Sequence, residues 1–497
     1  MSSNGSTTAR RRRWLPWALA GLLAFAVVLA LSLAYLVRGE RWTDATSRTP
    51  MELVRYADRR LIGHPNLQRV LSPMLDAIRR NQVREPPPNL PSLGKGQQPH
   101  ALAHAGYDAA GNPRPLARPV VTTVVTPASV AVSDVKGLVA AMSSAPPGSV
   151  IELAPGTYSV SQTLSTGMAG LPAKPIVMRA AKPGSVELVV TAVVGVWVTQ
   201  PYWVFENLDW RGACANHDAC EHAFHVVGAA RATVILNNRM RDFNAHLKVN
   251  GVNGVWPDGG LLQFSTLSND SPRRTDAPVS AIDLVGANAW VIADNRVERF
   301  AKDGGNQTSY GMCLKGAGDR VRAERNLVVC TPEQRATPGL RVGISLGCGA
   351  TGRAFCRDGR CDAEMSNGVV ANNVVAHCSD FGIDLHRAQA SLVAHNTLIN
   401  TEGIDARQST TRAIVVGNLV EGTIRARDGA RVDANANAVA RTLDTVLAMP
   451  DALDLHWLES SDQTRATPET ERDFCGNLRP PISPPGATLQ PRCDTPH

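Results

Sequence analysis

Short runs of β-branched and aliphatic residues recur along most of the chain, and each leads into an asparagine followed by another apolar residue. Clear copies are WVFENLDW, VILNNRM, WVIADNRV, VRAERNLVV, VVANNVV, LVAHNTLI and IVVGNLV, and FSTLSND is a weaker copy. The asparagines of these copies are Asn207, Asn238, Asn269, Asn295, Asn326, Asn373, Asn396 and Asn418. Their spacing of 22 to 47 residues predicts a stacked repeat, and the short β-branched units predict strands rather than helices.

We therefore predict an all-β fold, a right-handed parallel β-helix (solenoid), over residues 120–440. Successive coils of such a solenoid pair in parallel about 4.8 Å apart, so that aligned asparagines hydrogen-bond along the stack. Asparagine also tolerates the left-handed backbone of a sharp corner. The interval of 47 residues is close to two of the shorter ones. The segment SDVKGLVAAMSS, Ser133–Ser144, predicts a short amphipathic helix that caps the first coil.

The N-terminal part predicts a membrane anchor. Residues 14–37 form an uncharged apolar run, long enough to span a bilayer as a transmembrane helix, and residues 1–13 form a basic tail with four consecutive arginines. The positive charge predicts a cytoplasmic N-terminus, which places the β-helix domain in the periplasm of a bacterial cell, attached to the inner membrane by a single pass. A cleaved signal peptide is the alternative, although its apolar stretch is usually shorter.

Three further segments differ from the repeat in composition. Residues 38–82 have leucines and valines at helical spacing and predict a juxtamembrane helical segment. Residues 83–119 are rich in proline and glycine and predict an extended linker. Residues 441–497 predict a helix at Thr442–Ser460, followed by a proline-rich tail closed by a disulfide.

The net charge of +7 does not indicate a nucleic-acid-binding protein. Residues 1–41 contain six arginines and one glutamate, which leaves 45 basic and 43 acidic residues in the remainder of the 497-residue chain. The chain therefore lacks the basic surface that nucleic-acid binding requires outside its N-terminal tail.

Ten cysteines in a periplasmic domain predict disulfides. Close spacing pairs Cys214 with Cys220, Cys356 with Cys361 and Cys475 with Cys493, and leaves the pairing of the other four open. The first pair lies among His217, His222 and His225, so that a zinc site is the alternative to a disulfide-closed loop.

The segments SVIELAPGTYSV, KPIVMRAAKPGSVELV and YWVFENLDWRG resemble the opening of polysaccharide lyases of the chondroitinase B and alginate lyase family. The resemblance extends from Val120 to Arg425 and also includes the wider group of pectate-lyase-like β-helix proteins. It implies a right-handed parallel β-helix that acts on a polysaccharide containing uronic acids.

The resemblance also implies catalytic residues. In GMCLKGAGD, Lys315 matches the family's base, and in DLHRAQ, His386 and Arg387 match its Arg-His pair in reversed order. The two segments are expected two coils apart, about 10 Å. Thr308 and Tyr310 stand where the family has its calcium-binding glutamates.

The residues themselves suit proton abstraction next to a carboxylate. An arginine binds a carboxylate with two hydrogen bonds, and a lysine with a lowered pKa can act as a base. In FNAHLKVNG, His246 and Lys248 are two residues apart, which predicts one face of a strand, and Trp256 after them is a candidate for stacking on a sugar ring. Asp380 and Asp384 are candidate ligands for calcium.

The leading hypothesis is an anchored periplasmic lyase that cleaves an acidic polysaccharide by β-elimination. A C5-epimerase of uronates uses the same proton abstraction without cleavage. A non-catalytic carbohydrate-binding or envelope scaffold is the third hypothesis. Convergence of Lys315, Arg387 and His386 on one groove separates the enzymes from the scaffold.

Overall fold

The computed structural model describes residues 129–330, 339–458 and 464–488, together with a few helical residues between Leu67 and Leu75. The predicted basic tail, transmembrane anchor and linker lie outside these residues. The few described residues of the segment at 38–82 are helical. No helix within the described residues combines the length and the hydropathy needed to cross a bilayer.

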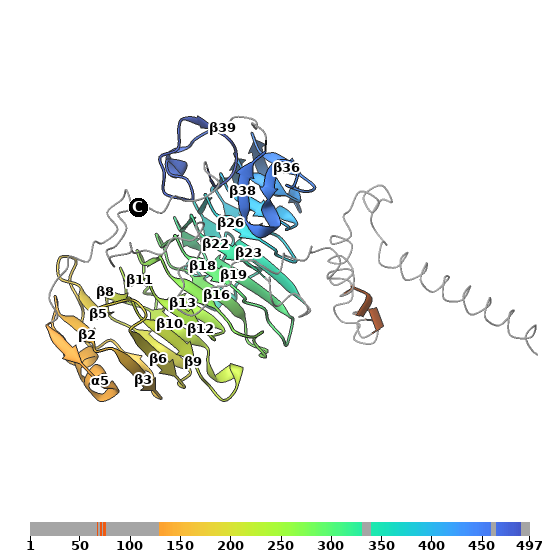
Figure 1. Ribbon diagram of the computed structural model, residues 1–497. Coiled ribbons are helices and arrows are strands. Elements are labelled where there is room, and N and C mark those ends of the chain that lie inside the picture. Colours follow the sequence, from red (N-terminus) through yellow and green to blue (C-terminus); the bar gives the residue numbers. More distant parts are fainter. Residues whose placement is uncertain are drawn as a thin grey trace, which may run out of the picture. The chain divides into compact units, whose positions relative to one another are not determined.

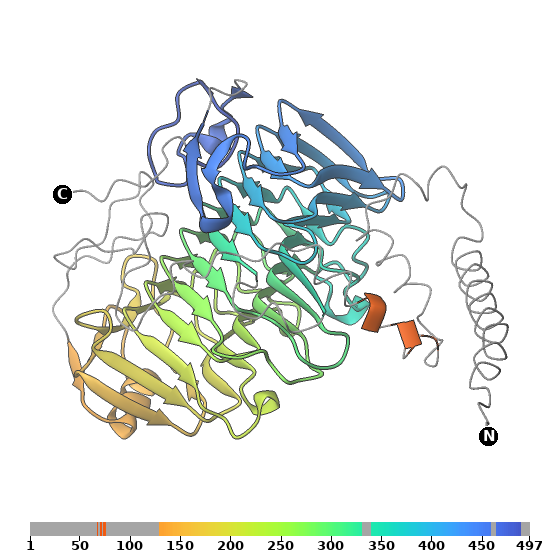
Figure 2. The same cartoon turned by 45° about the vertical axis from the view of Figure 1, so that its right-hand side comes forward.

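The described chain from Val130 onward is a parallel β-helix, which confirms the predicted solenoid (Figure 1). Three long parallel sheets of ten, twelve and eleven strands run along it, and each coil contributes a strand to each sheet in turn. Figure 2 shows the coils stacked from the first, near α5 (Val135–Ser144, orange), to the last, near β36 (Ala438–Ala440, blue). All the pairings within these three sheets are parallel, because the chain returns to each sheet in the same direction.

The ten-stranded sheet carries the candidate site described below. It consists of β4 (Leu164–Ser165), β7 (Val194–Val198), β10 (His222–Val227), β13 (Ala245–Asn250), β16 (Val279–Val285), β19 (Thr308–Lys315), β23 (Leu340–Leu346), β27 (Ile383–His386), β31 (Gly403–Arg407) and β34 (Thr423–Arg427).

The other two long sheets complete the wall of the solenoid. The twelve-stranded sheet consists of β1 (Val130–Val132), β2 (Val150–Leu153), β5 (Ile176–Ala180), β8 (Trp203–Glu206), β11 (Val234–Leu236), β14 (Leu261–Gln263), β17 (Val291–Ala293), β21 (Arg322–Glu324), β25 (Val369–Ala371), β29 (Ser391–Ala394), β32 (Arg412–Val416) and β35 (Arg431–Asn435). The eleven-stranded sheet consists of β3 (Gly156–Val160), β6 (Val186–Val190), β9 (Asp209–Gly212), β12 (Arg239–Arg241), β15 (Thr266–Ser268), β18 (Arg296–Glu298), β22 (Leu327–Val329), β26 (Val374–Ala376), β30 (Thr397–Ile399), β33 (Leu419–Glu421) and β36 (Ala438–Ala440). A short parallel sheet of β20 (Gly318–Asp319), β24 (Met365–Ser366) and β28 (Ala388–Gln389) lies at one corner.

A single apolar core fills the solenoid. Leu, Val and Ile side chains that point inward from the three sheets are almost completely buried, and Trp203, Phe205, Trp210 and Phe224 pack against one another in the early coils. The helix α5 (Val135–Ser144) covers the open end, with Asp134 as its N-cap and Leu138 and Met142 buried. This confirms the predicted capping helix.

A ladder of buried asparagines connects the coils at the corner between the twelve- and eleven-stranded sheets. Asn326 donates from its backbone N–H and from its side chain to Oδ1 of Asn373, at 2.9 and 3.0 Å. Asn373 donates in the same way to Asn396, and Asn396 to Asn418. The predicted role of these asparagines in stacking is therefore confirmed.

Three details of that prediction are wrong. Asn207 and Asn269 do not occupy ladder positions, because Leu208 and Ser265 make the equivalent backbone contacts. The left-handed residue at the corner is the one before the ladder asparagine, for example Arg325 (φ 52°), because the asparagine itself must point inward along the stack. The interval from Asn326 to Asn373 is also one coil with a long insertion, since the two residues bond directly.

The helix expected at Thr442–Ser460 is not formed. This segment contains β37 (Leu447–Met449) and β38 (Asp454–Trp457), which pair antiparallel around a short turn at Pro450–Ala452. Pro450 lacks the N–H that a helix interior requires, and Leu453 and Leu455 are both buried, which fits a strand. Together with Phe474, the segment covers the outer face of the eleven-stranded sheet.

Disulfides reinforce the later coils. The bonds expected between Cys214 and Cys220 and between Cys356 and Cys361 are present. Two further bonds join Cys313 to Cys348 and Cys330 to Cys378. Cys475 is disulfide-bonded, while Cys493 lies outside the described residues.

We predict that Asn373→Ala destabilises the solenoid, because it removes the acceptor for two buried N–H donors of Asn326. A buried donor left without a partner costs about 1–3 kcal/mol. Thermal and denaturant unfolding measure this loss, and Asn435→Ala, an exposed asparagine on β35, is the matched control. Equal stability of the two variants would contradict a structural role of the ladder.

Candidate functional site

Two rows of mostly polar side chains run across the outer face of the ten-stranded sheet, perpendicular to its strands, and we call the strip of surface that they form the groove. The strand register aligns the first row, which consists of Trp197, His225, Lys248, Asp283, Cys313, Ser345, Asp384, Asp405 and Arg425. It aligns the second row two residues further along each strand, with Asn250, Val285, Lys315, His386, Arg407 and Arg427. Adjacent members of a row are about 4.8 Å apart.

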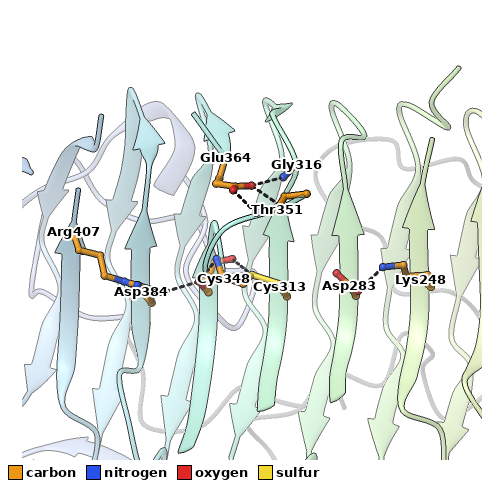
Figure 3. Close-up of a disulfide and its surroundings, with 10 residues drawn as sticks. Lys248, Asp283, Cys313, Gly316, Cys348, Thr351, Glu364, Asp384 and Arg407 are labelled. Carbon is orange, nitrogen blue, oxygen red and sulfur yellow. Dashed lines mark hydrogen bonds and ion pairs between the residues drawn. A yellow bond between two sulfur atoms is a disulfide. The ribbon is translucent and has the colours of Figure 1, made fainter. Parts of the chain in front are cut away.

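Buried carboxylates in the first row hold cations at the surface of the sheet (Figure 3). Asp283 accepts from Nζ of Lys248 at 2.5 Å, and Asp384 binds Arg407 through two hydrogen bonds of 2.9 Å. Asp405 binds Arg425 and Arg427. The side chains of the three aspartates are between 0 and 9% exposed, whereas those of their basic partners are 21 to 26% exposed, so the groups that face solvent are mainly positive.

Burial raises the pKa of Asp384, but the charge of Arg407 and hydrogen bonds from Arg407 and Ser345 outweigh this effect and hold the pKa below its usual value. Asp384 is therefore ionised, and the bidentate pair fixes the plane of the Arg407 guanidinium. Nη1 of Arg407 has no hydrogen-bond partner among the described residues, which leaves it available to an anionic ligand.

His386 lies beside Arg407 in the second row, on the neighbouring strand. Burial, followed by the charge of Arg407, lowers the pKa of His386, so its imidazole is neutral near pH 7. The Gly349 backbone lies close to the ring, and the buried Nδ1 lacks a hydrogen-bond partner in the described part of the chain. A neutral imidazole with one unpaired nitrogen is suited to accept a proton from a substrate that reaches this nitrogen.

Lys315 lies two strands from His386 in the same row, as the sequence predicts. Gly347 occupies the row position between them, so no side chain fills the space above the backbone there. Its φ of +113° and the His386 carbonyl 1.9 Å from an added Cβ require glycine. The Lys315 ammonium makes no hydrogen bond or ion pair with the described residues, although its charge acts on Asp283.

Tyr310 of β19 lies outside the two rows but close enough to Asp384 and Arg407 for their charges to act on its phenol. Burial raises the pKa of the Tyr310 phenol, and the nearby charge of Asp384 raises it further. The phenol therefore keeps its proton at neutral pH and can donate it. Lys315, Tyr310, His386 and Arg407 thus provide an acid, a neutral base and two cations on one face.

A disulfide-bonded loop borders the groove. Cys348 follows β23 and bonds to Cys313 of β19, so the sulfurs lie between Asp283 and Asp384 in Figure 3. Further along the loop, Glu364 accepts from the backbone N–H groups of Gly316 and Thr351 at 3.0 and 2.7 Å. These contacts connect the backbone that follows Lys315 to the loop that follows Cys348.

Arg387 does not join the row. Its φ of 56° turns the chain at the end of β27, and its guanidinium donates to the Cys361 carbonyl at 3.5 Å. The structure thus brings Lys315 and His386 to one groove and directs Arg387 toward the neighbouring loop. Arg407, on the next strand, supplies the guanidinium at the place where the sequence suggested Arg387.

His246 and Lys248 are not brought together. The His246 side chain is completely buried, and its Nε2 lies 2.9 Å from the Ser268 carbonyl oxygen in the eleven-stranded sheet. Lys248 points to the outer face and binds Asp283. The chain turns at the start of β13, so the alternation of side chains that the spacing assumes begins only after His246.

Trp256 lies against the disulfide-bonded loop. The Arg357 guanidinium stacks 4.9 Å from the centre of its ring and binds Asp258 through two hydrogen bonds. Gly251 and Gly286 leave room for the other side of the ring, since an added Cβ at either would lie 2.4 Å from its Nε1. The indole thus packs the loop onto the solenoid.

The carboxylate oxygens of Asp380 and Asp384 are not arranged to bind a calcium ion. Both oxygens of Asp384 accept from Arg407, and one also accepts from Ser345, while Oδ1 of Asp380 accepts from the N–H of Phe381. The one cluster of potential metal ligands in the described residues is Cys356, Asp358 and Cys361, and its two sulfurs form a disulfide. The zinc alternative at Cys214 and Cys220 is excluded for the same reason.

Three residues of the site were not identified from the sequence: Arg407, Gly347, and Tyr310 in the role of a proton donor. A signal for Arg407 was present: the motifs Asp-x-His at Asp384, Asp-x-Arg at Asp405 and Arg-x-Arg at Arg425 recur every 20 or 21 residues. Polar residues at alternate positions in strands of successive coils indicate a charged outer face. No comparable signal marks Tyr310 or Gly347, because their importance comes from strands that are distant in sequence.

No protein-family model and no curated protein matches the chain. Solved structures similar to it include pectate lyase Pel9A, with 16% identity, 71% of this chain and 90% of that chain covered, and a TM-score of 0.47. They also include an alginate lyase from Paenibacillus sp. str. FPU-7 (13% identity, 63% and 95% covered, TM-score 0.36). A third is the A-module of a mannuronan C-5 epimerase from Azotobacter vinelandii (12% identity, 63% and 95% covered, TM-score 0.40). Membership of the chondroitinase B and alginate lyase family stays a prediction.

We predict that acidification destabilises the protein in part through His246. Burial lowers the pKa of His246 to about 4, from 6.5 in the unfolded chain. Between these values the unfolded state binds more protons, so the free energy of unfolding falls as the pH falls from about 6.5 to 4. His246→Gln keeps a donor for Ser268 and removes the titration, so its unfolding midpoint should depend less on pH in this range. If the unfolding midpoint of His246→Gln depended on pH as the wild type's does, His246 would not be the group responsible.

Proposed function

We propose that the protein is a polysaccharide lyase that cleaves a uronic-acid-containing polysaccharide by β-elimination in the groove of the ten-stranded sheet. The observation that carries the proposal is the neutral imidazole of His386 between two cations, Lys315 and Arg407, in one row of the sheet. A groove whose exposed charges are mainly positive suits an acidic polymer laid across the strands.

In the proposed reaction, the substrate carboxylate lies between Lys315 and Arg407. Nδ1 of His386 removes the proton from C5 of the sugar, next to that carboxylate. The two cations stabilise the negative charge that develops on the carboxylate oxygens. The electron pair of the broken C5–H bond then forms the C4–C5 double bond, the bond between C4 and the glycosidic oxygen breaks, and the Tyr310 phenol protonates the departing oxygen.

Uronate C5-epimerisation is the second candidate, favoured by one observation. Along the direction of the strands, Tyr310 lies before the level of Asp384 and His386 lies after it. If the glycosidic bond is retained, the Tyr310 phenol can return a proton to C5 from the opposite side of the ring, which inverts that carbon. Because Asp380 and Asp384 do not fit calcium, the proposed roles in both reactions fall to side chains.

We expect His386→Ala to lower the elimination rate by about 10²–10⁴-fold, the usual contribution of a general base. Lys315→Ala should lower it by about 10²-fold, since it removes one of the two charges that stabilise the intermediate. The full-length chain is incubated with polymannuronate, polyguluronate, polygalacturonate and chondroitin sulfate, and the ultraviolet absorbance of unsaturated ends is recorded.

The matched control is Lys136→Ala, which removes an exposed lysine of α5. It should keep the wild-type rate. Wild-type rates in both groove variants would overturn the assignment of these residues. Absence of unsaturated ends, with uronates of inverted C5 among the products, would favour the epimerase, and binding without either product would favour a scaffold.

We further propose that the β-helix domain lies in the periplasm, held to the inner membrane by residues 14–37. The disulfides support an oxidising compartment, because such bonds rarely persist in the cytosol. Protease added to spheroplasts should digest the β-helix domain while a cytosolic marker stays intact. Protection of the domain until the cells are lysed would contradict this location.

A further inference from the structure

An exposed tryptophan lies on the same face as the groove, near its N-terminal end. Trp197 in β7 is 47% exposed, whereas its neighbours Val196 and Val198 are completely buried, so the indole points away from the core. Among the large apolar side chains that are exposed in the described residues, Trp197 is the only tryptophan. Ser165 and His225 flank it on the adjacent strands.

The first row continues from Trp197 through His225 and Lys248 to Asp283. Oδ2 of Asp283 accepts from Lys248, but Oδ1 has no hydrogen-bond partner among the described residues, although the side chain is only 9% exposed. Burial alone raises the pKa of Asp283, but the charges of Lys248 and Lys315 hold it below its usual value, so this oxygen is an ionised acceptor without a donor. A buried acceptor of this kind is satisfied by a hydroxyl group of a ligand or by water.

None of the groups assigned to proton transfer lies in this part of the first row. Four strand steps separate β7 from Lys315 on β19, which is about 19 Å. A strand step is close to the length of one sugar residue in an extended chain. A polymer that passes Lys315 and His386 along the rows therefore reaches Trp197 several residues away from the bond that is cleaved.

We propose that Trp197, His225, Lys248 and Asp283 form a distal subsite that binds the sugar residues of an acidic polysaccharide beyond the reacting one. Trp197 stacks on the apolar face of one pyranose ring, Lys248 binds a carboxylate, and Oδ1 of Asp283 accepts from a ring hydroxyl. Burial lowers the pKa of His225, and its Nε2 contacts Oδ1 of Asn250 at 2.6 Å, so His225 is a neutral wall of this subsite. The inference rests on the proposed function, because it extends the same groove.

The subsite makes binding depend on the length of the ligand. We expect Trp197→Ala to weaken binding of an octasaccharide about tenfold, as for the loss of a large aromatic contact, and to leave a disaccharide unaffected. Titration calorimetry with the full-length chain compares oligomannuronates, oligoguluronates and oligogalacturonates of the two lengths. Trp197→Phe, which keeps an aromatic face, should restore most of the affinity.

Ile414→Ala is the control, because Ile414 is 52% exposed on the twelve-stranded sheet, away from the groove. Unfolding midpoints of all variants verify that the exposed substitutions leave the fold intact. Wild-type affinity of Trp197→Ala for the octasaccharide overturns the subsite, whatever the catalytic result. Length-dependent loss of binding in that variant supports the subsite even if the wild type produces no unsaturated ends, which would overturn only the lyase proposal.

Discussion

The register between successive coils is the constraint on which the candidate site depends. Side chains alternate between core and solvent along each strand, so a shift of one residue would turn Asp384 and His386 inward and apolar residues outward. The asparagine ladder opposes such a shift, because each buried Asn donates twice to the Asn of the next coil. The ladder lies at a different corner from the groove, yet it fixes which residues of the ten-stranded sheet share a row.

The groove combines buried acids with more exposed bases. Removing a carboxylate from water is unfavourable unless a cation compensates it, and here each of the three aspartates has at least one basic partner on its own or an adjacent coil. The acids fix the direction of Lys248, Arg407, Arg425 and Arg427. Lys315 and the unpaired nitrogen of His386 remain outside these pairs, whereas Lys248 and Arg407 are each held by an aspartate and still face solvent in part.

The repeat, the fold and two disulfides could be predicted because they depend on local spacing and on periodic patterns. The same reasoning placed Lys315 and His386 two coils apart, as the register has them. It chose Arg387 instead of Arg407 because sequence proximity to His386 hides a turn in the left-handed conformation. Trp256 was selected because the motif FNAHLKVNG leads into its loop, whereas its contact with Arg357 comes from a loop about a hundred residues away. Contacts between coils, including the disulfide of Cys313 and Cys348 on neighbouring coils, are not encoded in any local pattern.

The central claim is that this groove removes the C5 proton of a uronate. Nuclear magnetic resonance follows this proton directly when an oligouronate panel is incubated with the full-length chain in deuterated buffer. The account predicts that the C5 proton signal of at least one substrate disappears with the wild type and persists with His386→Ala, whether the product is unsaturated or inverted. Persistence of the C5 signal in every oligouronate that the wild type binds would contradict it.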